Sequence, residues 1–171
     1  CEVMAAGFNY TDILPHLLAD AGTSYDLPGV CSEYHDYYMN RATTKSGCIA
    51  LTVTGELEPL AAIVKEIETK YPGQTYEGLD EHVFYDLQGY IEAICDEKDP
   101  LLDKFRAQMG KTFPTESRLH TPSFYSVYGL GDAPNGMHTI ENGKYSGVTT
   151  SAPCERFAPE WGQTSWYRAT H

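Results

Sequence analysis

The sequence lacks a long apolar run, a basic cluster and an initiator methionine. Its longest apolar stretches, such as "LAAIV" and "CIAL", are far shorter than the roughly 18 to 20 residues that a membrane-spanning helix needs, so we expect no membrane span. The net charge of −12, from 24 acidic and 12 basic residues, disfavours binding to nucleic-acid phosphates. The start at Cys1 predicts a processed chain that has lost a signal or pro-segment.

Familiar catalytic motifs are also missing. The chain has no H-E-x-x-H, no G-x-S-x-G, no P-loop and no G-x-G-x-x-G after a strand. None of the six histidines lies three or four residues from another, so no helix offers a ready metal-binding face. We therefore predict no metal site and no cofactor.

The five cysteines include no C-x-x-C pair, which excludes zinc-ribbon and thioredoxin-like sites. Their wide spacing is typical of long-range disulfides in an oxidising compartment. The odd count leaves Cys1 as the least suitable partner. The disulfide candidates are Cys31, Cys48, Cys95 and Cys154. With the sequon "NYT" at Asn9, these features predict a secreted or lumenal glycoprotein.

The length and the residue patterns predict a single α+β domain over residues 1–171. A helical part spans about 1–113, and a loop- and hairpin-rich part spans about 114–171. Hydrophobic periodicity predicts four to five helices, within residues 11–22, 31–42, 56–73, 80–97 and 99–110. A small antiparallel sheet is expected to include residues 48–54 and a hairpin over 138–148, turning at Asn142-Gly143. Disulfides would tie the long aromatic C-terminal segment to this fold.

The C-terminal segment is dense in aromatic residues. They either fill grooves on the helical part or form a binding surface for a ligand or partner. The candidate binding residues are Tyr125, Tyr128, Trp161 and Trp166.

The stretch "CSEYHDYYMNRA" places a histidine next to an aspartate, at His35 and Asp36. On a helix, Cys31, His35 and Tyr38 share one stripe, whereas Asp36 points away from it. Adjacent helical side chains do not meet, so this pattern does not form a His–Asp dyad. It favours a structural role for His35, hydrogen-bonded at the edge of the core.

Cys31, His35 and Asp36 also resemble the Cys–His–Asp helix of secreted phospholipases A2. That resemblance implies His35 as general base, Asp36 as calcium ligand, and calcium-dependent lipid hydrolysis. The second cysteine of those enzymes has no counterpart here, where Tyr37, Tyr38 and Met39 stand. Their glycine-rich calcium loop is missing upstream.

Two functions follow from these observations. The first is a secreted or lumenal acidic protein that acts without catalysis, by binding a small ligand or protein partner or as an assembly subunit. The alternative is a small secreted phospholipase A2-like hydrolase that uses His35 and Asp36 with calcium. Neither function involves nucleic acid or a membrane span.

Overall fold

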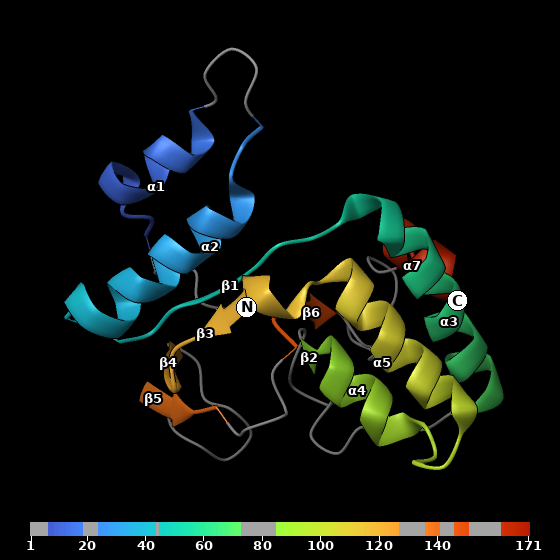
Figure 1. Cartoon of the computed structure of the whole chain (residues 1–171). Helices are drawn as coiled ribbons and strands as arrows, with labels where there is room; N and C mark the ends of the chain where they lie inside the picture. Colours follow the sequence, from blue (N-terminus) through green and yellow to red (C-terminus); the bar gives the residue numbers. More distant parts are fainter. Residues whose placement is uncertain are drawn as a thin grey trace.

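The computed structural model describes residues 7–18, 24–43, 45–72, 85–126, 136–140, 146–150 and 162–171 (Figure 1). Its helices are α1 (Tyr10–Leu17), α2 (Leu27–Asp36), α3 (Leu57–Lys70), α4 (Leu87–Ile94), α5 (Pro100–Thr112) and α7 (Ser165–Thr170). A π-helical turn η1 (Tyr37–Arg41) extends α2, and two 3-10 turns are η2 (Thr54–Glu56) and η4 (Thr115–Ser117). Among the described residues, no helix is long and apolar enough to cross a membrane.

The strands form three separate antiparallel pairs. They are β1 (Cys48–Ala50) with β3 (Arg118–His120), β2 (Tyr85–Asp86) with β6 (Thr149–Thr150), and β4 (Ser123–Ser126) with β5 (Gly136–Thr139). In the chain's first strand pair, Cys48 lies opposite His120. Figure 1 shows α3, α4, α5 and α7 grouped on one side, α1 and α2 on the other, and β1 and β3 between them.

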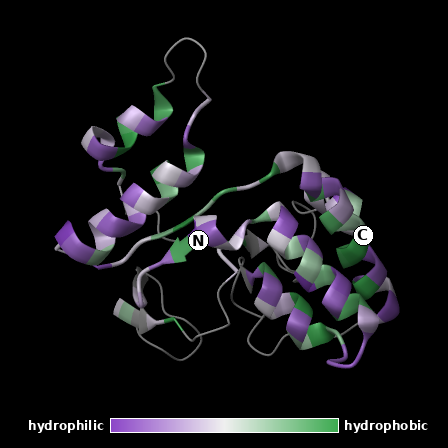
Figure 2. Cartoon of the chain, in the orientation of Figure 1, coloured by the Kyte–Doolittle hydropathy of each residue, from purple (hydrophilic) through white to green (hydrophobic). Residues whose placement is uncertain are grey.

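The hydrophobic core lies among α3, α4 and α5. The hydrophobic periodicity that predicts a helix over 56–73 is confirmed, because Leu60, Val64 and Ile67 on α3 are fully buried. The core residues are Leu60, Val64, Ile67, Leu87, Tyr90, Ile91, Ile94, Cys95, Leu101, Leu102, Phe105, Met109 and Phe113. Figure 2 shows these helices striped with hydrophobic and hydrophilic residues, which is the pattern of helices that bury one face.

Aspartates begin three of the helices. Asp26, Asp86 and Asp99 cap α2, α4 and α5 by accepting a backbone N–H from the first turn. Pro100 follows Asp99 at the first helical position of α5, as the sequence predicts. The helix predicted over 80–97 begins only at Leu87, because Tyr85 and Asp86 pair with β6.

The predicted sheet differs from the structure in its pairing. The strand over 48–54 is shorter, since only residues 48–50 pair with β3. The hairpin over 138–148 is not formed as predicted, because β5 pairs with the preceding β4 and β6 pairs with β2. The expected turn at Asn142-Gly143 lies outside the described residues. The Asn-Gly signal marks a local turn, but it cannot show which distant strand supplies the hydrogen bonds.

The predicted framework that joins all four candidate cysteines in disulfides is wrong, and with it the disulfide-stapled fold class. Cys31 and Cys95 carry free, buried thiols, so two of the four candidates are unpaired. Cys48 is not a free thiol, and Cys154 and Cys1 lie outside the described residues. The free cysteines belong to hydrophobic faces of α2 and the end of α4, where a thiol packs as a small apolar group.

Candidate functional site

His35 and Asp36 form hydrogen bonds with different partners. The half-buried His35 places Nε2 3.1 Å from the carbonyl oxygen of His120 on β3. Because a carbonyl only accepts, Nε2 carries the proton and donates it. Asp36 is exposed and accepts a hydrogen bond from Asn40 at 2.6 Å. His35 therefore joins α2 to β3, as the structural interpretation predicts.

The described free thiols are poor nucleophiles. Burial raises the pKa of the Cys31 thiol. Burial also raises the pKa of Cys95, and the nearby Asp99 carboxylate raises it further. A cysteine nucleophile reacts as a thiolate and needs partial exposure and a lowered pKa. Neither residue meets these requirements.

The two candidate binding residues that the structure describes lie on different elements, Tyr125 on β4 and Trp166 on α7. Trp166 is partly buried on α7 and packs against the helical core, which fits the groove-filling interpretation. Tyr125 lies on β4, while Tyr128 and Trp161 lie outside the described residues. Asn9 precedes α1, and its side-chain amide donates to the Asp12 carboxylate. Nothing in this arrangement supports glycosylation, and we withdraw the classification as a glycoprotein.

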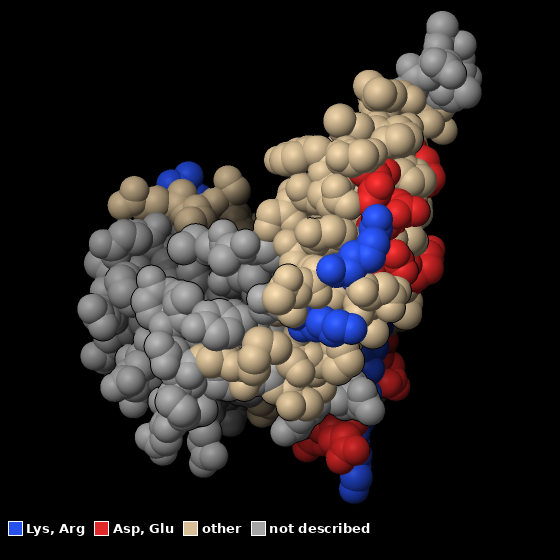
Figure 3. All heavy atoms as spheres, turned by 90° about the vertical axis from the view of Figure 1, so that its left-hand side faces the viewer, with Lys and Arg blue, Asp and Glu red and all other residues tan. Residues whose placement is uncertain are grey.

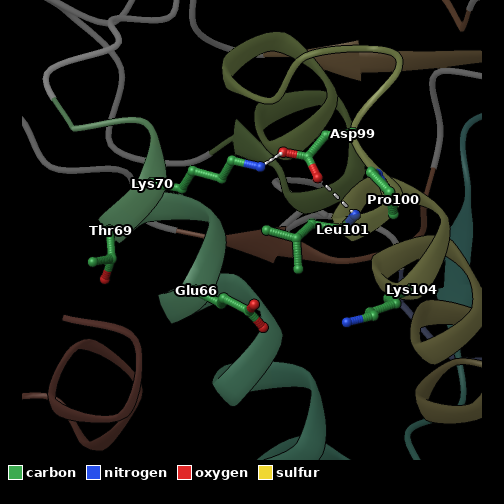
Figure 4. Close-up of a pocket in the computed structure, with 7 residues that line it drawn as sticks. All are labelled: Glu66, Thr69, Lys70, Asp99, Pro100, Leu101 and Lys104. Atoms are coloured by element: carbon green, nitrogen blue, oxygen red, sulfur yellow. Dashed lines mark hydrogen bonds and ion pairs between the residues drawn. The ribbon is translucent and has the colours of Figure 1, made fainter.

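A pocket of about 550 Å³ lies between α3 and the N-terminal end of α5 (Figure 4). Its lining residues are Glu66, Thr69, Lys70, Asp99, Pro100, Leu101 and Lys104. The Asp99 carboxylate accepts hydrogen bonds from Lys70 at 2.5 Å, Tyr71 at 2.6 Å and the Leu101 backbone at 3.0 Å. The Lys70 bond, followed by the Tyr71 bond, lowers the pKa of Asp99 to about 2. Asp99 therefore stays ionised and is committed to capping and pairing, not to proton transfer.

A second polar cluster joins three helices and was missed by the sequence analysis. Glu68 on α3 accepts a hydrogen bond from the Tyr90 hydroxyl on α4 at 3.2 Å. Its other oxygen lies 3.2 Å from Nε2 of His171, which follows α7. Burial raises the pKa of Glu68 to about 7, although the Tyr90 bond opposes this shift. The sequence does hold a signal, because Glu68 comes four residues after the buried Val64 and so faces inward.

Metal binding finds little support. Over the described ranges, no group of three His, Cys, Asp or Glu side chains could hold a metal ion. The prediction that no metal or cofactor is needed stays a prediction.

Comparison with solved structures finds related folds. The chain matches clostripain from Bacteroides thetaiotaomicron, solved with a peptide inhibitor, at 28% identity and a TM-score of 0.76, over 99% of this chain and 73% of that chain. It matches a secreted C11 cysteine protease from the same organism, iotapain, at 29% identity and a TM-score of 0.78. That match covers 99% of this chain but only 46% of the other.

A further secreted C11 cysteine protease from Bacteroides thetaiotaomicron, in complex with an irreversible peptide inhibitor, shares 17% identity at a TM-score of 0.67. The match covers 96% of this chain and 48% of that chain, and at this identity it shows the fold alone. No protein-family profile and no curated protein matches the chain. This chain thus spans less than half the length of two of the three structures.

These comparisons overturn both predicted functions. The structural neighbours are cysteine proteases, so the prediction of a non-catalytic binding protein or assembly subunit is wrong. The phospholipase A2-like alternative is wrong as well, and calcium binding at Asp36 was predicted only under that alternative. Over nearly its whole length, the chain is similar in fold to clostripain-type cysteine proteases.

Proposed function

We propose that this chain is part of a clostripain-like cysteine protease, which cleaves peptide bonds through a cysteine thiolate. The observation that carries the proposal is the match to two cysteine proteases over 99% of the chain, at 28% and 29% identity. The TM-scores of 0.76 and 0.78 support a shared fold over this length. The substrates would be peptides, in keeping with the peptide inhibitor bound to the first neighbour.

The described residues supply the scaffold of this enzyme in our proposal, not its nucleophile. Cys31 and Cys95 are buried with raised pKa values, and Cys48 is not free. The nucleophile would therefore be Cys1, Cys154 or a cysteine in the length of protease that this chain does not span. Covalent catalysis by a thiolate and a base requires no cofactor, so we propose none.

Location and partners follow from the same likeness. The second neighbour is a secreted protease, which supports a secreted location for this protein. The net charge of −12 supports the absence of nucleic-acid binding.

The test is covalent labelling of the protein purified from its native source. The probe is a biotinylated Val-Leu-Thr-Lys acyloxymethyl ketone, the type of inhibitor bound to the first neighbour. We expect the protein that contains these 171 residues to take up one equivalent and to hydrolyse a lysine-containing fluorogenic peptide. Pretreatment with iodoacetamide should abolish both signals. A native protein that neither takes the label nor hydrolyses peptides would refute the proposal.

Matched variants locate the nucleophile. Cys31→Ala and Cys95→Ala should leave labelling unchanged, because both thiols are buried. Cys1→Ala and Cys154→Ala test the cysteines outside the described residues. Loss of label in either of the first two variants, with an unchanged melting temperature, would contradict the assignment of a scaffold role to these residues.

A further inference from the structure

One face of α1 carries an uncovered apolar stripe. We call α1 and its flanks, residues 7–18 and 24–27, the arm. The exposed large apolar residues of the arm are Phe8, Tyr10, Leu14, Leu17, Leu18, Tyr25 and Leu27. Tyr10, Leu14, Leu17 and Leu18 recur at helical spacing and are 64%, 44%, 37% and 71% exposed. Among the described large hydrophobic residues, only Val53 and Met137 are comparably exposed elsewhere. A stripe of this kind marks an interaction surface.

The arm meets the rest of the molecule through its other side. Ile13 is the buried residue of α1, which packs on α2. His16 Nδ1 lies 2.7 Å from the Asp26 carboxylate at the cap of α2. Figure 1 shows α1 projecting from the body of the fold, and Figure 2 shows hydrophobic residues along it. The apolar side chains on the outer side of α1 are therefore left exposed.

Charged groups lie on a separate edge and already have partners. Arg41 of η1 pairs with Asp12 of α1 and with Glu33 and Asp36 of α2. Figure 3 shows acidic and basic side chains gathered along one edge of this region, beside a surface free of charge. The charged edge suits contact with water, whereas the apolar stripe requires an apolar partner.

We infer that the stripe of Tyr10, Leu14, Leu17 and Leu18 is the surface on which the rest of the clostripain-like protease packs. The occupant is the part of that enzyme beyond the length that this chain spans, so the inference rests on the proposed function. Both neighbours contain the arm, since they match 99% of this chain. This chain covers only 73% and 46% of them, so each has further chain available to cover the stripe.

Hydrogen exchange measures this contact directly. The backbone amides of residues 8–18 are followed by mass spectrometry in the isolated 171-residue chain and in the protein purified from its native source. We expect exchange in the native protein to be at least about tenfold slower, because packing suppresses local opening. Leu14→Glu in the native protein should remove that protection. Val53→Glu is the matched control, because Val53 is 41% exposed but lies outside the arm.

Each outcome decides the inference. In the isolated chain, Leu14→Glu should shift the melting temperature no more than Val53→Glu does. Such a result shows that the Leu14→Glu variant folds. Equal exchange in the isolated and native proteins would overturn the inference. So would protection of the isolated chain that rises with its concentration and disappears in Leu14→Glu, because a second copy would then be the occupant.

The two proposals fail separately. A native protein that takes no peptide ketone but protects residues 8–18 would refute the protease function and keep an apolar interface on the arm, with its occupant then reassigned. A native protein that takes the label while residues 8–18 exchange freely would refute the interface and keep the protease function.

Discussion

Glu68 on α3 and His171 after α7 form a contact of 3.2 Å in which burial inverts the usual order of proton affinities. Burial raises the pKa of Glu68 to about 7, and burial lowers the pKa of His171 below its usual 6.5. Burial is the largest cause of both pKa shifts. His171 Nδ1 lies 2.9 Å from the Thr170 hydroxyl, so both ring nitrogens of His171 lie next to polar groups.

This pair predicts a specific pH dependence of stability. An acid whose folded pKa is raised stabilises the fold below its unfolded pKa, and that contribution is lost as the pH rises through the folded value. The free energy of unfolding should therefore fall by about 2 kcal/mol as the pH rises from about 4.5 to about 7. Urea titrations at several pH values measure it.

Two variants isolate the carboxyl group. Glu68→Gln should remove this fall and leave the opposite, His171-dependent gain as the pH rises through about 6.5. Tyr90→Phe removes the hydrogen bond that lowers the pKa of Glu68, so the fall should extend to higher pH. An unchanged pH profile in Glu68→Gln would show that another group titrates.

The parts of the fold that local rules determine were predictable. Hydrophobic spacing identified α3 and its buried Leu60 and Val64, and Asp99-Pro100 marked the start of α5. Strand pairing was not predictable, because β1 finds its partner about 70 residues later in β3 and no local residue encodes that choice. The periodicity within residues 11–22 predicted a helix, but the same periodicity arises whether the apolar face packs on the chain's own core or on another surface.

For the candidate site, the sequence predicted which side chains do not act together, but not which residues form the site. Helical geometry correctly separated His35 from Asp36, because neighbouring side chains on a helix diverge. The cysteine spacing misled, since Cys31 and Cys95 satisfy the packing of helices and not a disulfide. No motif in the sequence marks a protease, and only the whole fold carries that likeness.

The His35 contact predicts a loss of stability without loss of chemistry. His35→Ala removes the donor to the His120 carbonyl and should lower the free energy of unfolding by about 1 kcal/mol. His35→Gln can donate from its amide and should recover part of this loss. Asp36→Asn should change little, because Asp36 is exposed. Labelling of the native protein by the peptide ketone should survive all three; an inactive but stable His35→Gln would contradict the structural role.

Asp99 predicts loss of helix capping in acid. Its pKa is lowered to about 2, chiefly by Lys70 and then Tyr71, so its contribution is present above the unfolded value near 3.8 and is lost as the pH falls toward 2. Asp99→Ala should lower the melting temperature at pH 7 by several degrees and flatten the acid limb. Asp103→Ala is the control, because that side chain lies in the first turn of α5 and is 88% exposed. Equal melting temperatures for the two variants would contradict the capping role.

Gly47 lies so close to the Tyr38 ring that we expect no larger residue to fit at this position. A Cβ at this position would lie 2.7 Å from Cγ of Tyr38, closer than packed carbons approach. Tyr38 is buried, and its hydroxyl donates to the Gly7 carbonyl at 2.7 Å. The backbone N–H of Gly47 donates to the Thr121 hydroxyl at 2.9 Å, next to β3. These hydrogen bonds restrain both the Tyr38 ring and the Gly47 backbone, so neither can move away freely from an added Cβ.

Gly47→Ala should therefore lower the free energy of unfolding by about 1–3 kcal/mol, the usual cost of overpacking. The matched control is Gly110→Ala, because Gly110 lies in α5 and, apart from its own stretch of helix, nothing lies within 4 Å of the added Cβ. Alanine favours a helix over glycine, so this second variant should raise stability by up to about 1 kcal/mol. Chemical denaturation of both proteins at pH 7 measures the two changes. Opposite signs are expected, and a neutral Gly47→Ala would mean that Tyr38 repacks without cost.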